Sequence, residues 1–78
     1  MIDRYLEADP VDLDRAAWRL KERAVPVWAI VGTLTEDGEN AAQVAADYGV
    51  SAEAVAAALV YYRHHSCVID ARLAANAA

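Results

Sequence analysis

Apolar and small residues recur at helical spacing on both sides of a single glycine in residues 40–65 of the chain. Asn40 is placed to cap a helix, and Gln43 follows three residues later, as in a capping box. Gly49 falls where that helix must end, because glycine adopts the left-handed backbone that follows many helices. Ser51 can then cap a second helix. The pattern therefore predicts a helix to Tyr48, a tight turn, and a helix from residue 52 to about 65.

The apolar positions of this region complete the pattern of a helix-turn-helix unit. Ala45 is small enough for two helices to approach, and Val50 is placed to fill the corner between them. The inward face of the second helix is predicted to carry Val55, Ala58, Leu59 and Tyr62. Adjacent helical residues point about 100° apart, so Tyr61 is then expected to face outward, towards a partner. Packing of Tyr61 within the same chain stays an open alternative.

The segment before this region is less regular. Asp9 and Pro10 form a helix-start signal, with the aspartate as cap and the proline at the first helical position. Residues 14–24 fit two structures: their apolar spacing fits a helix, while the alternation of Trp18 and Leu20 with basic residues fits a half-buried strand. We expect the helix, and the strand of a short hairpin stays open.

Two further helices are predicted around these elements. Pro26 suits the first turn of a helix that runs to Thr35. The inward stripe of that helix is predicted to be Val27, Ile30, Val31 and Leu34, and a turn follows at residues 36–38. Residues 66–76 predict a tail helix, with Ser66 at a kink or cap and with Val68, Ile69 and Leu73 on one side. The expected fold is mostly α: a single helix-turn-helix domain over residues 1–78, with three to five helices. A short N-terminal β-hairpin stays an open alternative.

The composition indicates a thin hydrophobic core. The chain has 78 residues, 58% of them apolar, but nineteen are alanines, which favour helix and bury little area. A single core of this size is marginally stable, so we expect a homodimer to contribute stability. The candidates for a dimer or partner interface are the large side chains outside the central motif: Trp18, Trp28, Tyr61, Ile69 and Leu73.

The net charge of −5 argues against a dedicated non-specific nucleic-acid binder. Residues 15–23 are an exception, with four bases and one acid. The candidates for DNA contact are these bases and the outward positions at the start of the second motif helix: Arg15, Arg19, Lys21, Arg23, Ser51, Ala52, Glu53 and Ala56, with Ala57 also expected to face outward. Base readout usually relies on Arg, Asn, Gln or Lys. A scaffold or protein interface is therefore favoured over sequence-specific DNA binding by the isolated protein.

Candidate chemistry is sparse. His64, His65 and Cys67 match no strong zinc spacing, so we expect surface groups at a helix end and no metal or cofactor. The acids of residues 12–14 and 36–39 have no histidine or phosphate-binding loop near them in sequence, so an enzyme is not expected. The single cysteine fits a reducing cytosol. With no signal-peptide pattern and no run of about 20 apolar residues, a cytoplasmic protein without a membrane segment is expected.

Several runs of the sequence together resemble one family. These runs are VPVWAIVG (residues 25–32), VAADYGVSAEAV (44–55), ALVYYRHH (58–65) and VIDARLAAN (68–76). They resemble domain-of-unknown-function family 433 over about residues 18–76. The resemblance implies a small helix-turn-helix protein, antitoxin-like, of a kind encoded beside PIN-like nuclease toxins. The chain departs from the family at Glu22-Arg23-Ala24, where a Gly-Thr-Arg turn is usual, so the N-terminal hairpin loses the glycine of its turn.

The resemblance and the residues lead to one expectation with two alternatives. The expected function is to bind and neutralise a partner protein, a PIN-like nuclease toxin, with binding to its own operator left open. An acidic protein suits a basic RNA-binding cleft, because complementary charge speeds and orients docking. The alternatives are a small dimeric DNA-binding regulator and a helix-turn-helix scaffold that binds no DNA.

Overall fold

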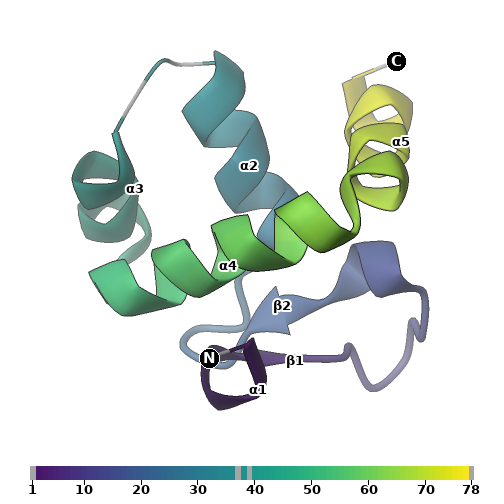
Figure 1. Ribbon diagram of the computed structural model, residues 1–78, viewed down its shortest axis with the longest axis horizontal. Helices are drawn as coiled ribbons and strands as arrows, with labels where there is room; N and C mark the ends of the chain where they lie inside the picture. Colours follow the sequence, from purple (N-terminus) through teal and green to yellow (C-terminus); the bar gives the residue numbers. More distant parts are fainter. Residues whose placement is uncertain (1, 37, 39, 78) are drawn as a thin grey trace.

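The fold is mostly α, with four helices of eight or more residues and one short antiparallel hairpin in the part of the chain that the structure describes (Figure 1). The structure is a computed structural model and describes residues 2–36, 38 and 40–77. The elements in chain order are α1 (Ile2–Tyr5), β1 (Leu6–Glu7), the 3₁₀ helix η1 (Arg15–Ala17), β2 (Arg19–Leu20), α2 (Val27–Glu36), α3 (Ala41–Tyr48), α4 (Ala52–His64) and α5 (Ser66–Ala77). α4 crosses the middle of the molecule, with α2 behind it, α3 and α5 towards its two ends and the hairpin below it (Figure 1).

Residues 14–24 form the 3₁₀ helix η1, the short strand β2 and a turn, so the expected continuous helix is wrong there and the open alternative, a short hairpin, is confirmed. Leu6 pairs with Leu20, and Glu7 pairs with Arg19, in antiparallel register. Leu6 and Leu20 expose only 2% and 0% of their surface. The strand prevails over the local helical spacing because pairing with a distant segment buries both leucines against the helices.

Asp9 and Pro10 do not start a helix, which corrects a second expectation. The Asp9 carboxylate accepts hydrogen bonds from two backbone N–H groups, at 2.8 and 3.0 Å, as a cap would. The chain then continues as an irregular loop, because Asp12 and Asp14 each accept a further backbone N–H in turn. Aspartate side chains of this kind replace the backbone partners that a helix would supply.

A tight turn connects β2 to the residues before α2. The Leu20 N–H donates to the carbonyl oxygen of Val25 at 2.7 Å. Inside the turn, Arg23 and Ala24 have φ of 58° and 52°, both in the left-handed region. This turn therefore forms without a glycine, at a conformational cost of about 1 kcal/mol or more for each of these residues.

The helix after Pro26 forms as predicted and ends at Glu36, one residue later than expected. Its inward stripe is confirmed for Val27, Ile30 and Val31, which are buried, whereas Leu34 is partly exposed and packs against the core. Of the turn expected at residues 36–38, Gly38 has φ of 67°, and Asp37 lies outside the described residues.

The core lies between α4, α2 and the hairpin. Its largest fully buried side chains come from six different elements or their flanks: Leu6, Leu20, Val27, Ile30, Val31, Val44, Val55 and Ile69. α4 contributes mainly small residues to this core, because Ala54, Ala57 and Ala58 are each 0% exposed. These alanines allow the hairpin and α2 to approach α4 from different sides.

The buried face of α4 is rotated from the predicted one. Tyr61 is 3% exposed, and its hydroxyl donates to the carbonyl oxygen of Arg15 at 2.6 Å. Tyr62 is only half-buried, and its hydroxyl donates to the Asp70 carboxylate at 2.8 Å. The expectation that Tyr62 enters the core and Tyr61 faces outward is wrong, because η1 and Trp18 pack against α4 at Tyr61.

The tail helix is confirmed as α5, which begins at Ser66 directly after His65 ends α4. Its predicted stripe is confirmed only in part. Ile69 is fully buried and Leu73 is partly buried, but Val68 is 37% exposed. In the described part of the chain no single helix is long and apolar enough to cross a membrane; α3 and α4 reach that length and composition only as a pair bent by 114°.

Candidate functional site

The predicted motif is a corner between α3 and α4, where the chain bends by 114°. Asn40 and Gln43 cap α3 reciprocally, at 2.9 and 3.0 Å, which confirms the capping box. Gly49 has φ of 69° and lies in the left-handed region, as predicted. The Ser51 hydroxyl accepts the Ala54 N–H at 3.1 Å and so caps α4. The corner thus has the helix ends that its sequence specifies.

The turn of residues 21–24 packs directly on this corner. Glu22 Oε2 accepts hydrogen bonds from the Ser51 N–H at 3.2 Å and from the Ser51 hydroxyl at 2.9 Å. Arg23 Nε donates to the carbonyl oxygen of Gly49 at 3.1 Å. A carboxylate at the N-terminus of α4 is favourable for the helix dipole. It also places negative charge where a DNA phosphate would approach this helix.

The predicted basic contacts do not form one continuous face. Arg19 pairs with the Glu7 carboxylate at 2.8 Å, and Arg23 is bound to Gly49. Arg15 lies in η1, at the opposite end of β2 from the turn that contains Lys21 and Arg23 (Figure 1). Arg15, Lys21 and Arg23 are exposed, and Arg19 is half-buried. The hairpin therefore divides the basic window between two ends of the molecule.

The start of α4 offers few groups for reading bases. Ala52 and Glu53 are exposed there, and Ser51 and Ala56 are half-buried. Ala57 is 0% exposed, so the expectation that it faces outward is wrong. The buried position of Ala57 follows from the rotation of α4 that also buries Tyr61. What remains outward is a small apolar surface beside a carboxylate.

The five interface candidates separate into buried and surface groups. Trp18 is half-buried and stacks on Tyr61, with ring centroids 5.1 Å apart and planes at 21°. Tyr61 also contacts the His65 ring at 4.5 Å, and burial raises the pKa of the Tyr61 hydroxyl. Ile69 is fully buried within the chain. Tyr61 and Ile69 are thus core residues of one copy and cannot reach a partner surface without unfolding.

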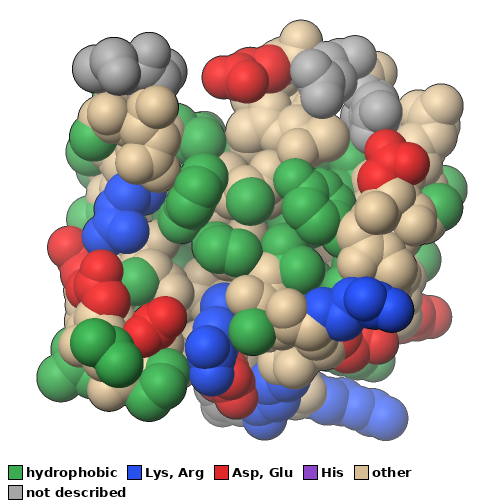
Figure 2. All heavy atoms as spheres, turned by 180° about the vertical axis from the view of Figure 1, so that it is seen from behind, with side chains coloured by type: hydrophobic (Ala, Val, Ile, Leu, Met, Phe, Trp, Pro, Cys, Tyr) green, Lys and Arg blue, Asp and Glu red, His purple; other side chains and the backbone are tan. Residues whose placement is uncertain are grey.

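Trp28 and Leu73, the remaining two candidates, are brought together in one groove. The groove has a volume of about 350 Å³ and is lined by α2, the end of α3 and α5. It appears in Figure 2 as a hollow between α5 and α2, with apolar side chains gathered over α2. Gly32 lies at its base, where an added Cβ would be 3.0 Å from Leu73 Cδ2. A larger residue at that position would press on α5.

Sequence reasoning missed the polar residues of this groove. Glu36, Tyr48 and Asn76 line it and come from three different helices. The Thr33 hydroxyl and the Tyr48 hydroxyl are 2.9 Å apart on its wall and share a hydrogen bond. The one local signal was Gly32, because a glycine inside a helical pattern usually has a packing or functional reason.

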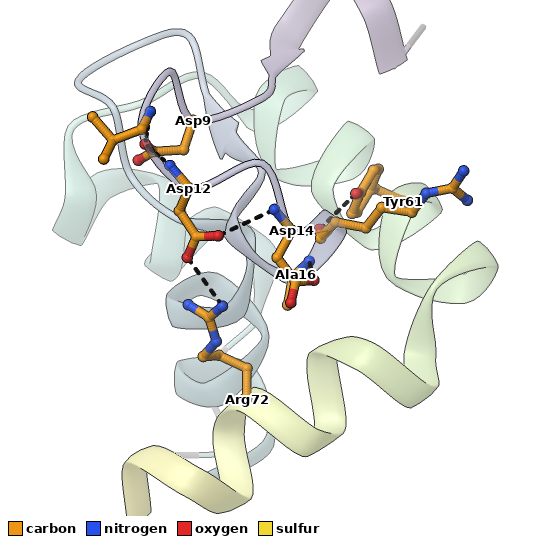
Figure 3. A network of polar contacts seen from close by, with 8 residues as sticks. Asp9, Asp12, Asp14, Ala16, Tyr61 and Arg72 are labelled. Carbon is orange, nitrogen blue, oxygen red and sulfur yellow. Dashed lines mark hydrogen bonds and ion pairs between the residues drawn. The ribbon is translucent and has the colours of Figure 1, made fainter.

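A second surface feature is the loop of residues 9–14, shown in Figure 3. Its apolar side chains point to solvent: Val11 is 91% exposed and Leu13 is 79% exposed. Backbone hydrogen bonds from residues 11 and 12 lower the pKa of Asp9. Asp12 holds the loop against α5 through a contact with Arg72 Nη2 at 3.3 Å (Figure 3). Because the helix expected to start at Asp9 and Pro10 does not form, Val11 and Leu13 lie in this loop.

The histidines and the cysteine lie at the junction of α4 and α5. His64 and Cys67 are exposed, and Cys67 is a free thiol. The His65 ring lies against the Tyr61 ring at an interplanar angle of 40°. Among the residues that the structure describes, no group of three or more His, Cys, Asp or Glu side chains is arranged to hold a metal ion.

Comparison with the curated proteins and with the solved structures found no match. A family model described as "Protein of unknown function (DUF433)" matches residues 17–62. This match begins just before β2 and includes the turn of residues 21–24, α2, α3 and most of α4. It covers more than half of the chain and confirms the resemblance seen in the sequence. The chain therefore belongs to this family, domain-of-unknown-function family 433.

Proposed function

We propose that this protein is an antitoxin-like module that binds and neutralises a basic partner protein through the loop of residues 9–14. A PIN-like nuclease toxin is the partner class that the family resemblance suggests. The observation that carries the proposal is the exposure of Val11 and Leu13, at 91% and 79%, between three aspartates.

The loop has the features of a prepared binding element. Asp9, Asp12 and Asp14 each accept backbone hydrogen bonds within the loop or from η1. A loop ordered before binding loses less conformational entropy when it binds. Apolar anchors surrounded by charged groups are the usual arrangement of a protein interface with a hydrophobic centre and a polar rim.

The charge of the chain favours a basic partner over DNA. The net charge is −5, and the three loop aspartates add a local acidic rim to the apolar anchors. A nuclease that binds RNA has a basic cleft, and charge complementarity would orient the two proteins before contact. At the α3–α4 corner, Glu22 and Glu53 set acidic groups beside the helix start that a DNA reader would present to phosphate.

The test is co-expression with any nuclease-like protein encoded beside this one, followed by purification through a tag on either chain. The wild-type pair should form a complex at micromolar concentration. The double variant Val11→Ser/Leu13→Ser should lose about tenfold or more in affinity, as expected when interface anchors are removed. Its melting temperature should stay unchanged, since both side chains are exposed.

Val68→Ser is the control, because Val68 is the other large exposed apolar residue among those the structure describes and lies in α5, outside the loop. This variant should bind the partner as the wild type does. Val68 also lines the hollow beside Asp14, so an equal loss of binding for Val68→Ser would show that recognition is not confined to the loop. Absence of any complex for the wild type would count against the proposed function itself.

A second candidate function is that of a small homodimeric DNA-binding regulator. The observation that favours it is the 114° bend between α3 and α4, within the range of about 90–120° that helix-turn-helix units use. Such a protein would bind two half-sites as a dimer. Binding to its own upstream DNA should then weaken steeply with salt.

The structure makes this second test more specific. Arg23→Ala should flatten the log–log salt slope by about one phosphate contact. Arg19→Ala should not, because its guanidinium is bound to Glu7. Glu22→Gln should tighten DNA binding by removing the charge at the start of α4. A wild-type protein that binds no DNA at low salt would remove this candidate.

A further inference from the structure

We propose that the groove between α2, α3 and α5 binds an organic cation, a guanidinium or ammonium group carried on an apolar arm. The groove lies on the other side of α5 from the loop of residues 9–14. Leu73 and Asn76 of α5 face the groove, whereas Arg72 faces a separate hollow that Asp14 also lines. The inference is therefore independent of the partner contact proposed above.

The walls of the groove suit a cation with an apolar arm. Trp28 and Tyr48 bring two aromatic rings to it from α2 and α3, and Leu73 adds an aliphatic surface from α5. Aromatic faces attract guanidinium and ammonium groups electrostatically, and tryptophan does so most strongly. The volume of about 350 Å³ is near the lower limit of small-molecule sites, about 300–1,000 Å³, so a ligand of side-chain size fits.

The charge of the groove favours a positively charged ligand. Glu36 is the one charged side chain among the described residues that line it, and no described residue forms a hydrogen bond or an ion pair with its carboxylate. On this face of the molecule, most Lys and Arg side chains lie in the lower half, away from the hollow (Figure 2).

Hydrogen-bonding groups are also available at the groove. The Asn76 amide lines it and has no hydrogen-bond partner among the described residues. The Glu36 carboxylate and the Asn76 amide oxygen are acceptors for the N–H groups of a guanidinium, and a charged donor makes such hydrogen bonds stronger. An anion would instead meet the Glu36 carboxylate, and a purely apolar ligand would leave both acceptors without a donor.

The experiment is a titration of ¹⁵N-labelled protein with N-acetylarginine amide, followed at the indole N–H signals of the two tryptophans. Trp18→Phe and Trp28→Phe identify which signal is which. The Trp28 signal should shift and saturate, while the Trp18 signal stays in place. N-acetylcitrulline amide, which has the same shape but no charge, should bind about fivefold more weakly or less well still.

Two glutamine variants isolate the carboxylate that the proposal needs. Glu36→Gln should weaken binding of the arginine ligand about fivefold and leave binding of the citrulline ligand unchanged. Glu53→Gln removes the same charge from an exposed glutamate of α4 outside the groove, and it should change binding by less than about twofold. Equal binding of both ligands, or an equal effect of both variants, would overturn the proposal.

Two further measurements are needed. One distinguishes a free cation from a polypeptide side chain, and the other distinguishes this site from the partner contact of the loop. The n-butylguanidinium ion has the head group and arm but no amide backbone: binding as tight as that of the blocked arginine indicates a free cation, and weaker binding indicates a polypeptide side chain. Val11→Ser/Leu13→Ser should bind the arginine ligand like the wild type. A loss of partner binding would then leave this site standing, and a silent Trp28 signal would overturn it without affecting the partner contact.

Discussion

Glu22 and Ser51 are 29 residues apart in the sequence, yet the Glu22 carboxylate accepts two hydrogen bonds from Ser51, from its N–H at 3.2 Å and its hydroxyl at 2.9 Å. The same hydroxyl accepts the Ala54 N–H at 3.1 Å. The Ser51 hydroxyl thus caps α4 as an acceptor and donates its own hydrogen to Glu22. The turn of residues 21–24 in this way fixes the orientation of the residue that starts α4.

Glu22→Ala should lower the free energy of unfolding by about 1 kcal/mol, because two hydrogen bonds to a charged acceptor at an exposed site are lost. For a domain of this size that corresponds to a fall in melting temperature of about 4–8 °C. Thermal denaturation followed by circular dichroism measures it. Asp47→Ala is the control, since Asp47 is an exposed acid of α3 without a hydrogen bond to another described residue. Equal shifts for both variants would show that Glu22 acts only through net charge.

Ala24→Gly should stabilise the protein by about 1 kcal/mol. Ala24 has φ of 52°, and glycine reaches this left-handed conformation without the steric cost of a Cβ. Ala42→Gly, at an exposed position inside α3, should instead destabilise by about 1 kcal/mol. Urea denaturation of the two variants should therefore give shifts of opposite sign. A loss of stability for Ala24→Gly would mean that the flexibility gained by the unfolded chain outweighs the strain relieved in the turn.

The helix ends of this fold could be predicted from the sequence because their chemistry is local. The side chain of Asn40, the missing Cβ of Gly49 and the hydroxyl of Ser51 each act within one helical turn. Residues 14–24 could not be assigned in this way. Their strand pairs with Leu6 and Glu7, and their turn adopts left-handed conformations at residues with side chains. The alternation around Trp18 and Leu20 indicated a strand, but local spacing alone could not select it over a helix.

The orientation of α4 about its own axis could not be predicted from local sequence either. Tyr61 and Tyr62 are adjacent aromatic residues, and helical spacing alone allows either one to be buried. The choice depends on Trp18 and on the carbonyl oxygen of Arg15, which meet Tyr61 from outside its helix. The groove was equally hidden, because Glu36, Tyr48 and Asn76 become neighbours only when three helices pack. Of its residues, Trp28 and Leu73 were expected at a surface contact on size alone.

The stability of the protein should fall as the pH rises above about 10, in part because of Tyr61. Burial raises the pKa of Tyr61 above 10.0 in the folded state. Between the unfolded and the folded pKa, the folded protein therefore holds the proton that the unfolded chain has lost. This contribution is complete below pH 10 and disappears as the pH passes through the folded pKa. Urea midpoints measured from about pH 8 to pH 11 follow the effect.

Tyr61→Phe is the variant that isolates this contribution. At pH 7 it should be less stable than the wild type by about 1 kcal/mol, because the Arg15 carbonyl oxygen loses its donor. Above pH 10 its stability should fall less steeply. Tyr62→Phe tests a second tyrosine with a raised pKa, which in this case is raised by the hydrogen bond to Asp70. Parallel pH curves for Tyr61→Phe and the wild type would assign the alkaline loss to other groups.

Gly49 and Arg23 should be coupled in a double-mutant cycle. Gly49 has φ of 69°, so an alanine there costs about 1–2 kcal/mol from the left-handed backbone alone. Its Cβ would also lie 2.9 Å from Arg23 Nε, which would displace the guanidinium from the Gly49 carbonyl oxygen. Gly49→Ala should therefore cost about 1 kcal/mol more in the wild type than in the Arg23→Ala background.

Gly38→Ala separates the two causes. Gly38 has φ of 67°, almost that of Gly49, but an added Cβ would meet nothing within 4 Å. Its cost should therefore be the backbone cost alone, about 1–2 kcal/mol, and should be the same with or without Arg23. If Gly49→Ala also proves independent of Arg23, the contact between Arg23 and Gly49 contributes nothing to stability. The attachment of the turn of residues 21–24 to the α3–α4 corner would then depend on Glu22 and not on Arg23.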